Sequence, residues 1–167
     1  MAEELKPIGI DASGYEVLTK AVRDLLSNYP GLDGEIIPFE ELSEDGGIIF
    51  SADAGALIMS ERRDITEHVK QTCQFPFFVI YRTSATREYE KLRVQTFLDT
   101  LGKWLCKEPA IIDGEIVRLS FYPALSEGRK ITRVTRSNSY GLQPNDNGTQ
   151  DWMLPVVVQY TNEFDIW

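Results

Sequence analysis

FPFFVIYRT, residues 75–83, decides the fold class, because it combines aromatic and β-branched side chains in a short run that favours a strand. The preceding run, residues 64–72, alternates weakly between apolar and polar side chains and is interpreted as a neighbouring strand of the same sheet. The connection between these runs is too short for a parallel crossover, which needs a dozen or more residues. We therefore expect an antiparallel pair.

An amphipathic helix is predicted over residues 14–29, where apolar side chains recur at helical spacing. Ser13 and Glu16 have the spacing of a capping box at its start, and Pro30 with Gly31 ends it.

A second helix is predicted over residues 85–107, capped by Ser84 or Thr86 and ended by Pro109. Its broad apolar stripe is expected to face the sheet. The stripe consists of Tyr89, Leu92, Val94, Phe97, Leu98, Leu101, Trp104 and Leu105.

Shorter apolar runs complete the predicted sheet. Strands are expected over residues 35–39, 48–52, 56–60, 115–122, 130–137 and 152–164. Residues 138–151 are rich in Asn, Gly and Pro and predict a long mobile loop, and residues 1–10 are expected to be flexible. The chain is thus predicted to be a single α+β domain over residues 1–167, with a mainly antiparallel or mixed sheet packed against two principal helices.

Composition is that of an ordinary soluble, cytosol-type domain, with 43% apolar and 26% charged residues. No apolar run approaches the ~20 residues that cross a bilayer, and the charged first residues do not resemble a secretory signal. Cys73 and Cys106 have no metal-ligand spacing, and we expect both thiols to be reduced.

The net charge of −9 is unevenly distributed. Residues 1–74 hold fifteen acidic and six basic side chains, whereas residues 75–167 hold eleven of each. A solvated acidic face would explain this asymmetry. A chain with one acidic and one basic end can instead associate head to tail. The excess of acid opposes binding to phosphate backbones, so no direct sequence-specific contact with nucleic acid is expected.

Residues with catalytic or ligand-binding potential form no recognisable constellation in the sequence. His68 is the single histidine, and nothing places a nucleophile beside it. The carboxylates of residues 40–45 lack the ladder of a calcium loop, and phosphate-binding glycine motifs are missing. The aromatic side chains could form a stacking platform for bases, but core packing explains their spacing better. We expect no catalytic residue, no cofactor and no metal, and therefore no enzyme.

The order of the elements resembles a known family. Its individual motifs are weak, but the resemblance covers roughly residues 14–164 as an order of parts. The segments that carry it are Tyr-Pro-Gly-Leu (29–32), Gly-Glu-Ile-Ile-Pro-Phe (34–39), Glu-Glu-Leu (40–42), Gln-Phe-Pro-Phe-Phe-Val-Ile-Tyr-Arg (74–82) and Phe-Leu-Asp-Thr-Leu-Gly-Lys-Trp-Leu (97–105). They are similar to the tail terminator group of long-tailed bacteriophages, often labelled minor capsid or tail completion proteins.

This resemblance implies a virion protein at the junction of tail and neck, assembled in the host cytoplasm. The subunits would form a homo-oligomer, a hexameric ring that caps the tail tube, stops its polymerisation and joins it to the head. The implied partners are the tail tube protein and a neck or head-completion protein, with no membrane involved. Residues 53–66 depart from the family pattern because they are longer and more charged.

Candidate interface residues follow from the charge asymmetry and from two tryptophans near strand or chain ends. They are Glu40, Glu41, Glu44 and Asp45 on the acidic side, Arg129, Lys130, Arg133 and Arg136 on the basic side, and Trp152 and Trp167 as apolar contacts. Two other functions stay open. An acidic binding module, such as an immunity or inhibitor protein that masks a basic site, would suit a sequence pI near 4.7. A small hydrolase with scattered carboxylates has the least support.

Overall fold

The computed structural model describes residues 12–32, 37, 44, 46–53, 56–84, 87–125 and 128–166, with residues 12–15 described by their backbone alone. These residues form two α-helices, α1 (Ala12–Ser27) and α2 (Glu88–Leu105), and a 3-10 turn, η1 (Pro30–Leu32). Their strands are β1 (Gly47–Ala52), β2 (Leu57–Arg63), β3 (His68–Ser84), β4 (Ala110–Ile112), β5 (Glu115–Val117), β6 (Arg129–Arg136), β7 (Tyr140–Gly141) and β8 (Thr149–Asp165). The predicted α+β class is confirmed.

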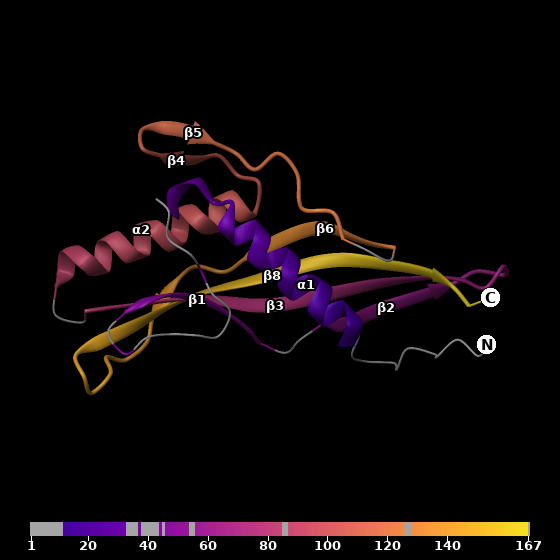
Figure 1. Ribbon diagram of the computed structural model, residues 1–167, viewed down its shortest axis with the longest axis horizontal. Coiled ribbons are helices and arrows are strands. Elements are labelled where there is room, and N and C mark those ends of the chain that lie inside the picture. The colour runs from indigo at the N-terminus through magenta and orange to yellow at the C-terminus, as the bar shows by residue number, and fades with distance from the viewer. Residues whose placement is uncertain are drawn as a thin grey trace.

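β3 and β8 form the centre of the six-stranded antiparallel sheet that these residues build (Figure 1). Both strands are 17 residues long, and they pair from His68 opposite Asp165 to Ser84 opposite Thr149. β1 and β2 pair with the outer side of β3, whereas β6 and β7 pair with the outer side of β8. The sheet therefore has a β1/β2 edge and a β6/β7 edge.

The two strands predicted over residues 64–72 and 75–83 are in fact one strand, so their division was wrong. β3 continues through Pro76, and its central partner is β8 from the far end of the chain. The chain reverses earlier, where the Asp64 carboxylate accepts hydrogen bonds from the backbone N–H groups of Thr66 at 2.8 Å and His68 at 3.1 Å. Glu67, with φ 64°, completes this turn.

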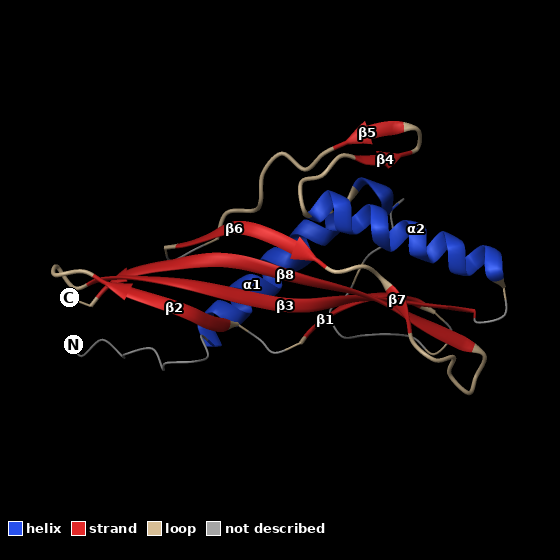
Figure 2. Ribbon diagram, turned by 180° about the vertical axis from the view of Figure 1, so that it is seen from behind, coloured by secondary structure: helices blue, strands red, loops and turns tan. Residues whose placement is uncertain are grey.

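One face of the sheet carries the core, because successive side chains of a strand point to opposite faces. Its buried residues on the central strands include Phe75, Phe77 and Val79 of β3 and Leu154, Val156 and Val158 of β8. Both helices lie on this side, and Figure 2 views the sheet from the opposite side, with no described helix in front of it. The opposite face carries half-buried apolar pairs such as Phe78 opposite Pro155 and Ile80 opposite Met153.

α2 differs from its prediction at its start and in its buried face. Arg87 is the N-cap and makes no side-chain capping bond, while Ser84 belongs to β3 and Thr86 lies outside the described residues. Tyr89 and Leu92 are 78% and 65% exposed, so they do not belong to the core stripe. Successive residues of an α-helix are rotated by about 100° around its axis. Tyr89 and Leu92 therefore lie on the side of α2 opposite its buried residues Val94, Leu98 and Leu101.

The predicted strand over residues 115–122 is also shorter in the structure. β5 ends at Val117 and pairs with β4 in a separate hairpin, seen above α2 in Figure 1. Asp113 and Gly114 have φ values of 51° and 80°, as a two-residue hairpin turn requires. The sheet strands predicted over residues 48–52, 56–60, 130–137 and 152–164 are confirmed, with small changes at their ends.

The loop predicted over residues 138–151 contains more structure than expected. β7 pairs with β8, and β8 already begins at Thr149. Between them, the Asn145 N–H donates to the Thr149 carbonyl at 2.7 Å, and the Thr149 hydroxyl bonds to the Asn147 side chain at 2.6 Å. The strand predicted over residues 35–39 and the flexible segment 1–10 fall outside the described residues, apart from Ile37, which is buried. Neither described helix combines the length and apolarity that a bilayer crossing requires.

Candidate interaction surface

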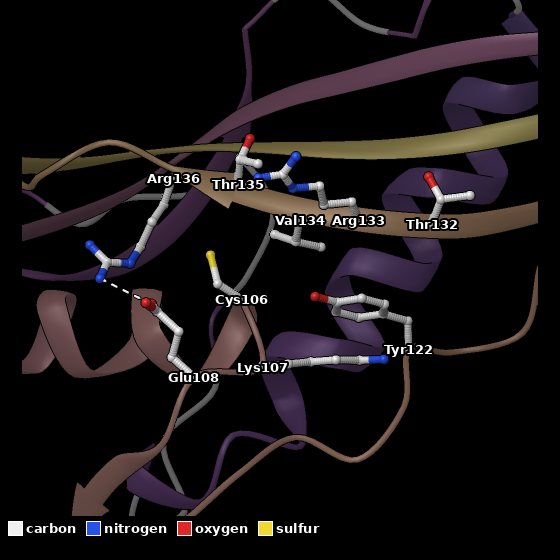
Figure 3. A pocket seen from close by; sticks show the side chains of 9 residues that line it. All are labelled: Cys106, Lys107, Glu108, Tyr122, Thr132, Arg133, Val134, Thr135 and Arg136. Atoms are coloured by element: carbon white, nitrogen blue, oxygen red, sulfur yellow. Dashed lines mark hydrogen bonds and ion pairs between the residues drawn. The ribbon is translucent and has the colours of Figure 1, made fainter.

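A cleft of about 570 Å³ lies between the end of α2 and the strand β6 (Figure 3). Three separate parts of the chain line it: residues 106–108, Tyr122 and residues 132–136. Its ionisable side chains include three cations, Lys107, Arg133 and Arg136, and one carboxylate, Glu108. We call these residues the cationic cleft, because positive charge prevails in it although the whole chain carries −9.

The end of α2 fixes the position of Lys107. The N–H of Lys107 donates to the Trp104 carbonyl at 3.0 Å, and the N–H of Glu108 donates to the Lys103 carbonyl at 2.9 Å. This pair of bonds is the Schellman arrangement, which places a residue with left-handed φ just after the helix. Lys107 occupies that position, with φ 60°, where glycine is the usual residue.

Tyr122 closes one side of the cationic cleft. Its hydroxyl donates to the Leu105 carbonyl at 2.9 Å, which satisfies an acceptor at the helix end. Burial raises the pKa of Tyr122 to about 12, so the hydroxyl stays a neutral donor. The ammonium of Lys107 lies 4.4 Å from the centre of the Tyr122 ring, within the range of a cation–π contact.

The cations of the cleft differ in their ion pairs. Arg136 lies 3.2 Å from Glu108 and 3.7 Å from Asp99, so its charge is largely balanced. Lys107 and Arg133 form no ion pair with any residue that the structure describes. Cys106 also lines the cleft, and its thiol is held protonated, because its burial raises its pKa although Arg136 and Arg133 favour the thiolate. This cysteine and Cys73 are free thiols.

The predicted basic cluster is only partly a surface. Lys130 and Arg133 are exposed and Arg136 is half-buried, but Arg129 is 3% exposed. Arg129 lies opposite Asn162 on the core face of the sheet, and Asn162 is itself buried and bonded to Gln71 at 3.0 Å. The prediction that Arg129 meets a neighbouring subunit is therefore wrong.

Trp152 is a second correction. It is 8% exposed and lies opposite Tyr81 on the core face, so it packs within its own chain rather than against a neighbour. Among the other predicted interface residues, Glu40, Glu41, Asp45 and Trp167 lie outside the described residues.

Glu44 is exposed and lies near the β1 end of the sheet. Its carbonyl accepts a hydrogen bond from the Asn147 amide at 3.2 Å. The pKa of Arg82 is raised first by its hydrogen bond to Asp151 and to a smaller extent by the charge of Glu44. Arg82 lies opposite Gly47, the first residue of β1. Glu44 thus lies close to the start of β1 and to the loop between β7 and β8.

The β4–β5 hairpin presents an apolar surface that sequence reasoning missed. Ile111 and Ile116 lie directly opposite each other and are 71% and 76% exposed. Ala110 and Val117, the next pair, face the core instead. The Asp113-Gly114 turn was the signal that could have revealed this hairpin.

His68 lies at the far end of β3, with its Nδ1 atom 2.7 Å from the Asp165 carboxylate. The side chain of Asp165 is largely exposed and that of His68 is half-buried. The hydrogen bond from the imidazole to Asp165 raises the pKa of His68 above its ordinary value. In the part of the chain that the structure covers, no three His, Cys, Asp or Glu side chains are arranged to hold a metal ion.

We expect Asp165→Asn to lower the pKa of His68, because it removes the carboxylate that favours the charged ring. Since the folded-state pKa is raised, this pair stabilises the protein fully below the unfolded pKa of about 6.5 and loses its effect as pH rises through the folded pKa. The stability difference between wild type and Asp165→Asn should therefore shrink as pH rises. NMR titration of the single histidine checks the shift, and equal pKa values in both proteins would contradict it.

No family model matches this chain, and a search of curated proteins finds no related sequence.

Proposed function

We propose that this chain is a structural rather than a catalytic protein, the subunit of a ring similar to the tail terminators of long-tailed phages. The ring would cap a tail tube, stop its polymerisation and connect it to a neck or head-completion protein. Its place would be the tail-neck junction of the virion, after assembly in the host cytoplasm. The α+β subunit with a large antiparallel sheet agrees with what the sequence resemblance implies.

The strand order of the sheet carries this proposal. β1 belongs to one edge and β6 to the other, with β3 and β8 between them. Exposed Glu44 lies beside β1, whereas exposed Lys130 and Arg133 lie on β6. Separate acidic and basic sites on one subunit favour head-to-tail contacts, and such contacts close into a ring when the rotation between subunits allows it.

Ring formation is the direct test. We expect the purified chain to form an oligomer of about six subunits, at high concentration or when tail tubes are supplied. The reason is that head-to-tail contacts between identical subunits can close into a ring. Native mass spectrometry and electron microscopy of capped tubes would measure this. Association should weaken in a salt series, because contacts between exposed charges are screened.

The contrary outcome has a clear meaning. A chain that stays monomeric at every concentration and beside tail tubes contradicts the ring. If that monomer binds one basic protein instead, the acidic binding module becomes the better function, as the net charge of −9 would favour.

A further inference from the structure

We propose that the cationic cleft binds the acidic segment, residues 40–45, of a second copy of this chain. Lys107 and Arg133 receive its carboxylates. This inference rests on the proposed function, because it identifies the contact by which neighbouring subunits recognise each other.

The cleft offers two cations that no described carboxylate balances. Arg136 is held by Glu108 and Asp99, so it shapes the wall of the cleft, as Figure 3 shows for its bond to Glu108. Arg133 is exposed on the edge strand β6, and Lys107 stands at the end of α2. Both residues line the cleft, so an anionic partner at the cleft meets two positive charges.

Lys107 is arranged in advance for such a partner. The Schellman bonds fix its backbone, and the Tyr122 ring holds its ammonium at 4.4 Å. A side chain that is already ordered loses less conformational freedom when a ligand binds. The non-glycine residue at a left-handed φ costs backbone stability, which is consistent with a role for the lysine side chain itself.

The acidic segment is the matching occupant within this chain. It holds four carboxylates in six residues, Glu40, Glu41, Glu44 and Asp45. Glu44 does not line the cleft of its own chain, and its backbone carbonyl accepts a hydrogen bond from Asn147 in the loop between β7 and β8. A copy placed head to tail can instead bring its acidic segment to this cleft.

A labelled synthetic peptide of residues 38–47 tests the contact on the full-length chain. We expect the peptide to bind, and a matched peptide with Gln or Asn at the four acidic positions to bind much more weakly. Equal binding of both peptides would overturn the proposal, because the carboxylates would then play no part.

Variants of the chain locate the contact. Lys107→Gly removes the ammonium at a position whose φ suits glycine, and Arg133→Gln removes the charge on β6. Combined, they should weaken binding of the acidic peptide about tenfold. Lys130→Gln is the matched control, an exposed cation of β6 that does not line the cleft, and it should change binding less than about twofold. An equal loss in the control would overturn the assignment to the cleft.

Two further measurements complete the test. Inorganic phosphate should displace the peptide only in large excess, and phosphate binding as tight as peptide binding would make the cleft a phosphate site and overturn the peptide occupant. Oligomer mass is measured in parallel. If the variant that lacks the charges of Lys107 and Arg133 still forms rings, this inference is overturned but the proposed function stands. If the chain binds the peptide but stays monomeric at every concentration, the contact stands and the proposed ring is overturned.

Discussion

Leu101→Ala is expected to lower the free energy of unfolding by about 2–5 kcal/mol, whereas Leu92→Ala should change it by less than about 0.5 kcal/mol. Both substitutions remove the same atoms from the same helix, α2. Leu101 is fully buried against the core, while Leu92 is 65% exposed. Leu101→Ala therefore leaves a cavity. Leu92→Ala places alanine, which has a high helix propensity, at a position that faces solvent.

Chemical denaturation followed by circular dichroism measures both values. Because alanine replaces leucine in each variant, the difference between them isolates burial from helix propensity. Similar losses at the two positions would contradict the face of α2 that the structure assigns to the core.

Val158→Asp is expected to abolish stable folding or cost at least about 4 kcal/mol, whereas Val157→Asp should leave a folded chain. The two valines are neighbours in β8. Val158 is 1% exposed on the core face, opposite Phe75, so an aspartate there buries an unpaired charge. Val157 is half-buried on the other face, opposite Pro76, where the carboxylate can reach water.

This pair of variants tests the register of β8, because a shift by one residue would exchange the two faces. Expression, circular dichroism and denaturation curves give the comparison. A soluble, fully stable Val158→Asp variant beside an unfolded Val157→Asp variant would reverse the assignment of the faces.

Periodicity in the sequence predicted the class, both helices and most strands of the sheet. It succeeded where the apolar spacing was regular, as in α1 and β6. It failed at β3, because Gln74 and Pro76 interrupt the apolar pattern and suggested a break. The structure shows a continuous strand there, since pairing with β8 along its full length outweighs the weak local preference.

The candidate interface was harder to predict because burial depends on which strand lies opposite. Arg129 and Trp152 sit at strand ends in the sequence, yet their partners Asn162 and Tyr81 place both on the core face. The cationic cleft combines three segments distant along the chain, so no local pattern contains it. Glycine usually marks a left-handed helix end, and a lysine at that position gives no such signal.

The central position of β8 has a consequence for synthesis on the ribosome. His68 and Asp165, which lie side by side, are 97 residues apart in the chain. Until residue 165 has left the exit tunnel, the inner side of β3 and the inner side of β6 have no strand between them. Contacts so distant in sequence form slowly, and unpaired strand edges attract other chains. We therefore expect the nascent protein to expose a long apolar strand until β8 pairs with it, and to be bound by chaperones that shield such edges.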